Sequence, residues 1–242
     1  MNWIYGFFMA WGMFLAIPCP ARIWREEARR HMLACLPLVG ALVGGLWALL
    51  GWLLRGAPGA VRALLLAALP WLVTGFLHLD GYMDVCDAVL SRRDLATRQK
   101  ILKDSHCGAF AVICLVLLML AQYSCFRDAG TLRLWVLALI PVVSRASAGL
   151  AVLLLRPMGT SQYAAMVHGD RGKAAVLGII LLAAVALPLV FGQCAAPLAA
   201  CAAYWLAILE GTRQLGGMSG DISGFGLTLA ELAGAAVLCL WG

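Results

Sequence analysis

The chain has 242 residues, of which 63% are hydrophobic and only 12% are charged. Soluble globular domains carry roughly 25% charged residues, and the mean hydropathy here is +0.91. The composition therefore excludes a soluble globular protein and predicts an integral membrane protein. The net charge of +6 does not indicate a nucleic acid partner, because the basic residues are distributed as they are in membrane loops.

The N-terminal segment 1–17 is apolar and rich in aromatic residues, and it ends at Ile17-Pro18-Cys19-Pro20. A membrane-spanning helix needs roughly 20 apolar residues, so this segment is marginal for spanning. Aromatic side chains are enriched where membrane meets water. The sequence therefore predicts an interfacial or re-entrant helix here, followed by a polar stretch at 22–31.

Seven further apolar segments predict transmembrane helices. They cover approximately residues 33–54, 63–79, 109–126, 132–155, 174–192, 196–209 and 226–241. The short linker Gln193-Cys194 between the fifth and sixth segments predicts a tight helical hairpin. No internal repeat is evident, and we expect residues 1–242 to form one all-α catalytic domain, a polytopic membrane helix bundle.

The basic residues predict the orientation of this bundle. Thirteen of the eighteen Lys and Arg residues fall in the loops 17–32, 80–107, 156–173 and 210–225, whereas four fall in the opposite loops. By the positive-inside rule the first side is cytoplasmic. Nearly all acidic residues lie on this side too, which predicts an active face directed to the cytoplasm of the cell (inner) membrane.

Three acidic residues follow the second apolar segment at helical spacing. Asp80, Asp84 and Asp87 lie within about 60° of one another on a helix. Their mutual repulsion is relieved if they bind Mg²⁺, which prefers oxygen ligands; the alternative is that they are solvated acids of a loop. His78 points about 160° away on a continuous helix, so a role in proton transfer requires a break at Gly81.

The cluster Lys103-Asp104-Ser105 closes the same polar segment. Asp94 can cap a short helix that runs toward Lys103, which would return Asp104 to the first acids. Asp104 is then a further metal ligand and Lys103 a phosphate partner. The alternative is a capping and turn cluster without a catalytic role.

Two more motifs are candidates for substrate contact. Arg145 lies inside an apolar segment, where it binds either a phosphate or carboxylate of a ligand or an acidic residue of the chain. The turn Gly216-Gly217-Met218-Ser219-Gly220-Asp221 precedes the last apolar segment. Free N–H groups at Gly217 and Ser219 would cradle a phosphate, and Asp221 would contribute a metal or ribose contact.

Clustered acids, basic partners and a glycine turn together fit phosphoryl transfer, in which metal ions neutralise phosphate oxygens. The residues alone do not name the substrate. A membrane phosphotransferase of the CDP-alcohol type is an alternative, but its acid order, D-G-x-x-A-R followed by G-x-x-x-D-x-x-x-D, is not found. A cation-coupled transporter is another, although transporters place their acids near the bilayer midplane and within repeats.

The motifs in order resemble those of the cobalamin synthase family, adenosylcobinamide-GDP ribazoletransferase. They are His78-Leu79-Asp80-Gly81-x-x-Asp84-x-x-Asp87, Lys103-Asp104-Ser105-x-x-Gly108, Ser144-Arg145 and Gly216-Gly217-x-Ser219-Gly220-Asp221. The resemblance covers essentially the whole chain. It implies an Mg²⁺-dependent membrane enzyme that transfers the adenosylcobinamide phosphate of adenosylcobinamide-GDP to a ribose hydroxyl of α-ribazole or its 5′-phosphate, releasing GMP.

The resemblance also implies residue roles. Asp80, Asp84 and Asp87 would bind the metal with help from Asp104, and Asp80 would accept the hydroxyl proton. Lys103 and Arg145 would hold the diphosphate, and Asp221 with its glycines a nucleotide or second metal. The expected partners are these two small substrates and membrane lipid, with no nucleic acid; homo-oligomer formation stays open.

Overall fold

The computed structural model describes residues 1–159 and 170–241, and the regular secondary structure in this range is helical apart from one isolated bridge between Pro157 and Met218. The middle of the loop expected at 156–173 lies outside the described residues. The helices are α1 (Asn2–Phe14), α2 (Glu26–Leu53), α3 (Gly59–Val73), α4 (Leu77–Leu90), α5 (Leu95–Ile101), α6 (Ala109–Arg127), α7 (Leu134–Leu154), α8 (Arg171–Ala186), η2 (Leu187–Phe191), α9 (Ala195–Leu215) and α10 (Gly220–Trp241). The all-α prediction is confirmed.

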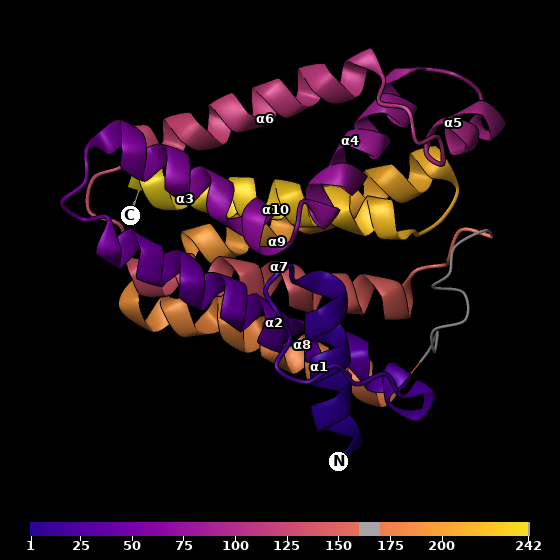
Figure 1. Cartoon of the computed structure of the whole chain (residues 1–242), viewed down its shortest axis with the longest axis horizontal. Helices are drawn as coiled ribbons and strands as arrows, with labels where there is room; N and C mark the ends of the chain where they lie inside the picture. The colour runs from indigo at the N-terminus through magenta and orange to yellow at the C-terminus, as the bar shows by residue number, and fades with distance from the viewer. Residues whose placement is uncertain (160–169, 242) are drawn as a thin grey trace.

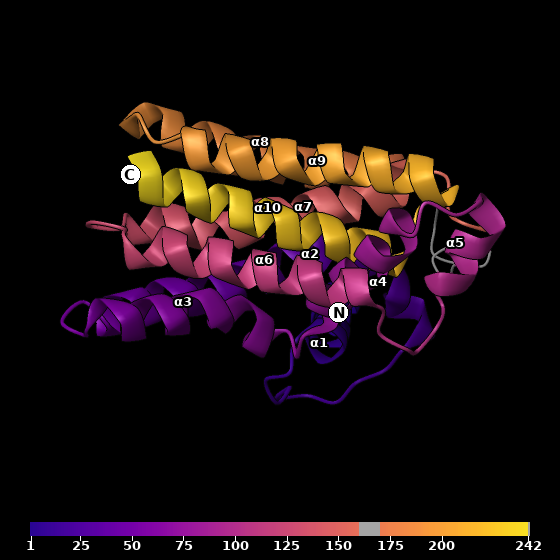
Figure 2. The same ribbon diagram turned by 90° about the horizontal axis from the view of Figure 1, so that it is seen from above.

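The long helices run side by side as one bundle (Figures 1 and 2). Among the described residues, six helices are long and apolar enough to cross a membrane, and the bent pair α3 and α4 forms a seventh candidate. The chain is therefore a polytopic membrane protein, and six of the seven expected spans are present without a sharp bend. The predicted hairpin is present as well, because η2 ends at Gly192 with φ 67° and α9 begins at Ala195.

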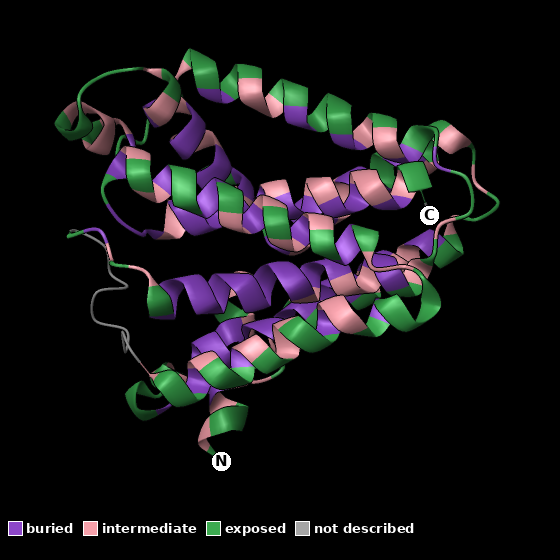
Figure 3. Cartoon of the chain, turned by 180° about the vertical axis from the view of Figure 1, so that it is seen from behind, coloured by how far each residue is buried: buried purple, intermediate pink, exposed green. Residues whose placement is uncertain are grey.

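The centre of the bundle is α7, whose most apolar stretch is 83% buried (Figure 3). Two glycines of α2 permit its close approach. A Cβ on Gly40 would lie 2.4 Å from the Pro141 carbonyl oxygen, and a Cβ on Gly44 would lie 2.0 Å from that of Ala138. Small residues spaced four apart let membrane helices pack backbone to backbone, so this pair of glycines holds α2 against α7.

The second expected span, 63–79, is wrong in detail, because the chain bends by 91° between α3 and α4. Gly75 and Phe76 both adopt left-handed conformations, with φ values of 59° and 63°. Hydropathy stays high through the run 63–79 although it contains Gly75, so hydropathy alone predicts one continuous helix. The bend at 75–76 instead ends α3 and starts a separate helix, α4, which has Asp80 in its first turn.

Helix α1 lies across the direction of the bundle rather than along it (Figure 1). Its 13 residues are too few to cross a bilayer, and it packs on the first half of α2 through Met9, Ala10, Ala28 and Met32. This geometry fits the interfacial or re-entrant helix that its aromatic residues predict. The polar stretch 22–31 is partly helical, because α2 begins at Glu26.

Both views place the helix ends that border the basic loops at one end of the bundle, together with α4 and α5. The turns 54–58 and 128–133 and the last residue of α10 lie at the other end. The outward faces of the spans carry large apolar side chains exposed to the surroundings, such as Leu117, Ile179 and Leu206. Lipid tails are the natural environment for such a surface.

Candidate active site

The acidic residues of α4 meet a fourth acid from the far end of the sequence. Helix α4 carries Asp80, Asp84 and Asp87 in one continuous helix, as their spacing predicts. A Cβ on Gly81 would lie 2.8 Å from the Asp221 Cα, so the start of α10 touches the start of α4. Asp84 consequently interacts electrostatically with Asp80, Asp221 and Asp87. The glycine turn and the α4 acids thus belong to one site.

Two further contacts fix the crossing of α4 and α10. Gly224 lies against the backbone of His78, where a Cβ would come within 2.9 Å of the His78 carbonyl oxygen. The Thr228 hydroxyl donates a hydrogen bond of 3.2 Å to the same oxygen. Backbone contact and a side-chain hydrogen bond therefore hold the acids of the two helices at one end of the bundle.

Asp87 lies over the start of the next span. Its carboxylate occupies the space that a Cβ of Gly108 would need. Gly108 has an ordinary φ of −86°, so the glycine is required here for space and not for its backbone conformation. The motif Lys103-Asp104-Ser105-x-x-Gly108 therefore meets the acidic cluster through its glycine.

None of the carboxylates Asp80, Asp84, Asp87 and Asp221 forms an ion pair with any described Lys, Arg or His residue. Like charges held together without a counter-ion favour a divalent cation with oxygen ligands. In the part of the chain that the structure describes, no three His, Cys, Asp or Glu side chains already stand at metal-binding distances from a common point. The donor set thus fits Mg²⁺ chemically, in an arrangement more open than a closed coordination sphere.

Asp104 and Lys103 form no described hydrogen bond or ion pair with this cluster. Asp94 caps α5 as predicted, because its side chain accepts a hydrogen bond from the Thr97 N–H. Asp104 is exposed, and its carboxylate accepts the backbone N–H of His106 at 3.0 Å and lies 2.6 Å from the ring Nδ1. The side-chain hydrogen bond lowers the pKa of Asp104. The described contacts match the turn cluster that was the alternative for Asp104, and they place Lys103 in solvent.

The N–H group of Gly217, which the sequence predicts to be free for a phosphate, is already used within the chain. The N–H groups of Gly216 and Gly217 both donate to the Thr212 carbonyl, and the Met218 N–H donates to the carbonyl of Arg156. Gly216 ends α9 in the left-handed region with φ 81°. Gly216 therefore terminates α9 next to α5, and Gly217 packs on the segment 156–158.

Ser219 stands at the start of α10. Its hydroxyl accepts a hydrogen bond of 3.3 Å from the Ile222 N–H, which is the geometry of an N-cap. The same hydroxyl lies 3.5 Å from the Asp221 carboxylate and is the donor of that long contact. Ser219 thus caps α10 and helps to orient the Asp221 side chain. Helix α10 begins six residues before the expected start at 226.

Arg145 is buried, with 2% of its surface exposed. Its guanidinium forms an ion pair with Glu231 of α10, and the Ser144 hydroxyl joins the pair. The sequence analysis considered such an ion pair but did not single out Glu231. Glu231 could have been found as this partner, because it is a lone acid in an apolar span and a charge inside the membrane needs a partner. Within residues 1–159 and 170–241, the Nε and Nη2 atoms of Arg145 have no hydrogen-bond partner.

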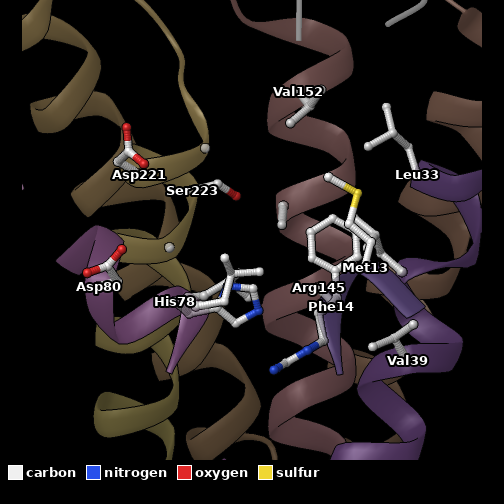
Figure 4. A pocket seen from close by; sticks show the side chains of 16 residues that line it. Met13, Phe14, Leu33, Val39, His78, Asp80, Arg145, Val152, Asp221 and Ser223 are labelled. Carbon is white, nitrogen blue, oxygen red and sulfur yellow. The ribbon is translucent and has the colours of Figure 1, made fainter. Parts of the chain in front are cut away.

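A cavity extends from the acids into the bundle. Asp80 and Asp221 form one side, His78 and Arg145 lie between, and Met13, Phe14, Leu33 and Val39 form the opposite wall (Figure 4). About 150 Å³ of this cavity is free, which is ample for several water molecules. His78 faces this space from α4, where its ring lies 6.2 Å from that of Phe14. No break at Gly81 is needed to bring His78 to the site.

Comparison with known proteins gives this arrangement a family. Residues 6–239 match the family described as CobS, cobalamin-5-phosphate synthase. An adenosylcobinamide-GDP ribazoletransferase of Clostridium perfringens (strain 13 / Type A) is 37% identical over 95% of both chains. Another, from Clostridium botulinum (strain Alaska E43 / Type E3), is 33% identical over 99% of both chains.

A ribazoletransferase of Pseudomonas putida (strain W619) is 40% identical over 88% of this chain and 90% of its own length. No solved structure matches the chain. The resemblance that the motifs indicate is confirmed, since the matches reach from the first helix to the last. The chain belongs to the CobS family, cobalamin-5-phosphate synthase.

Proposed function

We propose that this protein is an adenosylcobinamide-GDP ribazoletransferase, as its relatives are named. One observation carries the proposal: α10 brings Asp221 against α4, so that four carboxylates with no ion-pair partner among the described residues share one end of the bundle. Such a site suits a phosphoryl transfer in which both substrates are anionic. A CDP-alcohol phosphotransferase or a cation-coupled transporter is not favoured, because the relatives match along nearly the full chain.

The reaction exchanges one phosphorus–oxygen bond for another. A ribose hydroxyl of α-ribazole, or of its 5′-phosphate, attacks the cobinamide-side phosphorus of adenosylcobinamide-GDP. The new ester bond forms, the bond to the GMP oxygen breaks, and GMP leaves. Asp80, which is exposed at the cavity, accepts the hydroxyl proton.

Asp80, Asp84, Asp87 and Asp221 would hold Mg²⁺. Bound there, the metal neutralises charge on the phosphate oxygens. Lys103 is exposed in the loop that follows α5, where its long side chain is free to contact the diphosphate, and Asp104 remains a candidate to assist. Ser219 and Gly217 act by shaping the turn that presents Asp221.

Arg145 contributes as a substrate-contacting residue at the end of the cavity that it forms with His78, which we call the inner end. We place the active face toward the cytoplasm and the bundle in the cell (inner) membrane. The concentration of Lys and Arg on the loops beside the acids supports this orientation. Both nucleotide-containing substrates would then meet the site from the cytoplasm.

Release of GMP tests the proposal directly. The purified full-length protein in lipid nanodiscs is given adenosylcobinamide-GDP and α-ribazole, with Mg²⁺ or with chelator. We expect GMP and adenosylcobalamin in equal amounts, only with all three components present. Absence of product from folded protein under every condition would refute the proposed function, and undiminished turnover in chelator would refute the metal assignment alone.

A further inference from the structure

The cavity behind Asp80 and Asp221 has two chemically different sides. Its acids lie on α4 and α10, whereas its far wall consists of apolar side chains from α1 and α2, including Met13, Phe14 and Leu33 (Figure 4). A phosphate-binding site would be polar throughout. This cavity instead has one acidic side, where the reaction would occur, and one apolar side, which favours an apolar group.

The charges around the cavity disfavour an anion at its inner end. Arg145 provides a positive charge there, but its ion pair with Glu231 already neutralises it. Asp80 and Asp221 line the same space, so the net charge around the cavity is negative. The inner end therefore suits an uncharged group, even though the Arg145 guanidinium lines it.

Hydrogen-bond donors are nevertheless available at the inner end. Arg145 is 2% exposed, and its Nε and Nη2 find no hydrogen-bond partner among the residues that the structure describes. In the described part of the chain the His78 ring forms no hydrogen bond, and it lies close enough to interact electrostatically with Arg145. A buried donor without an acceptor is costly. A ligand that offers one acceptor nitrogen would relieve this cost.

We propose that this cavity is the subsite for the base of ribazole, an inference that rests on the proposed function. The base is a benzimidazole with two methyl groups, so it combines an apolar ring with one free acceptor nitrogen. Its methylated ring would pack against Phe14, Leu33 and Val39, and its nitrogen would accept a hydrogen bond at the end formed by His78 and Arg145. The attached ribose would extend toward Asp80.

The other parts of the substrates fit the cavity less well. Guanine presents several donors and acceptors at its edges, which the apolar wall would leave unpaired. The corrin ring far exceeds a cavity with about 150 Å³ of free space. The base is thus the substrate fragment whose polarity and size match both sides.

Base selectivity tests the inference without depending on absolute activity. We would measure kcat/KM for α-ribazole and for the α-riboside of unmethylated benzimidazole, at saturating adenosylcobinamide-GDP. In Leu33→Phe the added ring would fill the space that we assign to the methyl groups of the base. We therefore expect the kcat/KM for α-ribazole, divided by that for the unmethylated riboside, to fall at least about tenfold, the lower end of the effect of one methylene in an apolar pocket. The KM for adenosylcobinamide-GDP should not change.

The matched control is Leu38→Phe, because Leu38 lies on the same helix but is 54% exposed on the outer face. It should keep the wild-type ratio. If Leu33→Phe does not fold, Leu33→Ala provides the opposite test, since an enlarged pocket should increase the relative use of a naphthimidazole riboside. Folded variants that leave every base ratio at the wild-type value would overturn the subsite.

His78→Phe tests the polar end of the pocket. The riboside of dimethylindole has a carbon in place of the acceptor nitrogen, so wild-type protein should use it at least about tenfold less well than α-ribazole. His78→Phe should lose most of this discrimination and keep the preference for methyl groups. Unchanged discrimination would overturn the role of His78.

The same measurements separate the two hypotheses. If wild-type protein releases no GMP with any riboside, the proposed function itself fails. If wild-type protein is active but Leu33→Phe changes only the KM for adenosylcobinamide-GDP, the cavity belongs to the nucleotide substrate and the base subsite is wrong.

Discussion

Asp84 is half-buried among three other carboxylates, and no described cation pairs with it. The side chain can therefore act only by attracting a cation or by carrying a proton. Asn keeps the shape of Asp but removes its charge, so the exchange separates these functions from packing.

Asp84→Asn should lower the rate of GMP release by about 100-fold or more, because metal neutralisation of a phosphate is worth several kcal/mol. Insertion into the membrane should be unaffected. Asp128→Asn is the matched control, since Asp128 is an exposed acid that ends α6 at the opposite end of the bundle. Near-normal turnover of folded Asp84→Asn would remove this residue from the metal site.

Glu231 lies in the bundle interior with 5% of its surface exposed. Glu231→Leu leaves the buried Arg145 charge uncompensated, and we expect a loss of about 3–5 kcal/mol of stability. The double variant Arg145→Leu and Glu231→Leu should regain most of this stability, because it removes both charges.

Thermal unfolding followed by size-exclusion chromatography in detergent would measure both changes. A double variant no more stable than Glu231→Leu would contradict the ion-pair explanation. Its GMP release should stay low, since the cavity would lack the guanidinium that we assign to the substrate.

At the scale of helices, the crossing of α4 and α10 positions the acids. Gly224→Ala adds one carbon within 2.9 Å of a backbone oxygen of α4, and backbone cannot move aside cheaply. We expect lower stability and a greater loss of GMP release, because the two sets of acids would separate.

Gly178→Ala on α8 is the control for this change, since a Cβ there meets nothing within 4 Å. Alanine favours a helix over glycine by about 1 kcal/mol, so the control should be neutral or stabilising. If both variants behave alike in thermal unfolding and in GMP release, the crossing does not depend on Gly224.

Much of this architecture could be predicted from the sequence, and the misses have physical causes. The helical spacing of Asp80, Asp84 and Asp87 and the cap at Asp94 are local patterns, and the structure contains both. The early start of α10 was missed because glycines at 220, 224 and 226 usually break helices. Here Gly224 and Gly226 permit contact between helices, which only the tertiary structure reveals.

Tertiary packing also explains the other misses. The partner of Arg145 is 86 residues away in sequence, and no spacing rule connects such a pair. The N–H groups of the glycine turn are used by Thr212 and by the segment after α7. From the sequence alone these groups appear free, because nothing local predicts that pairing.

At the scale of the whole molecule, orientation can be tested with a native residue. Cys107 is exposed beside the acidic end of the bundle, whereas the other eight cysteines are buried or half-buried. A membrane-impermeant maleimide should label wild-type protein in inverted vesicles and not in sealed right-side-out vesicles. Cys107→Ser should abolish this signal, and labelling of Cys107 from outside the cell would reverse the proposed orientation.

The bend between α3 and α4 affects how strongly the acids attract ions. Helix α3 has 15 residues and rises about 22 Å, which is less than the roughly 30 Å of a hydrocarbon core. We therefore expect the first turn of α4, with Asp80, to start below the level of the lipid headgroups. At such a depth the effective dielectric constant is well below that of bulk water. At 4 Å, a pair of unit charges gains about 4 kcal/mol at a dielectric constant of 20, compared with about 1 kcal/mol in water. Ionic strength in the cytosol should consequently have little influence on cation affinity at this recessed position.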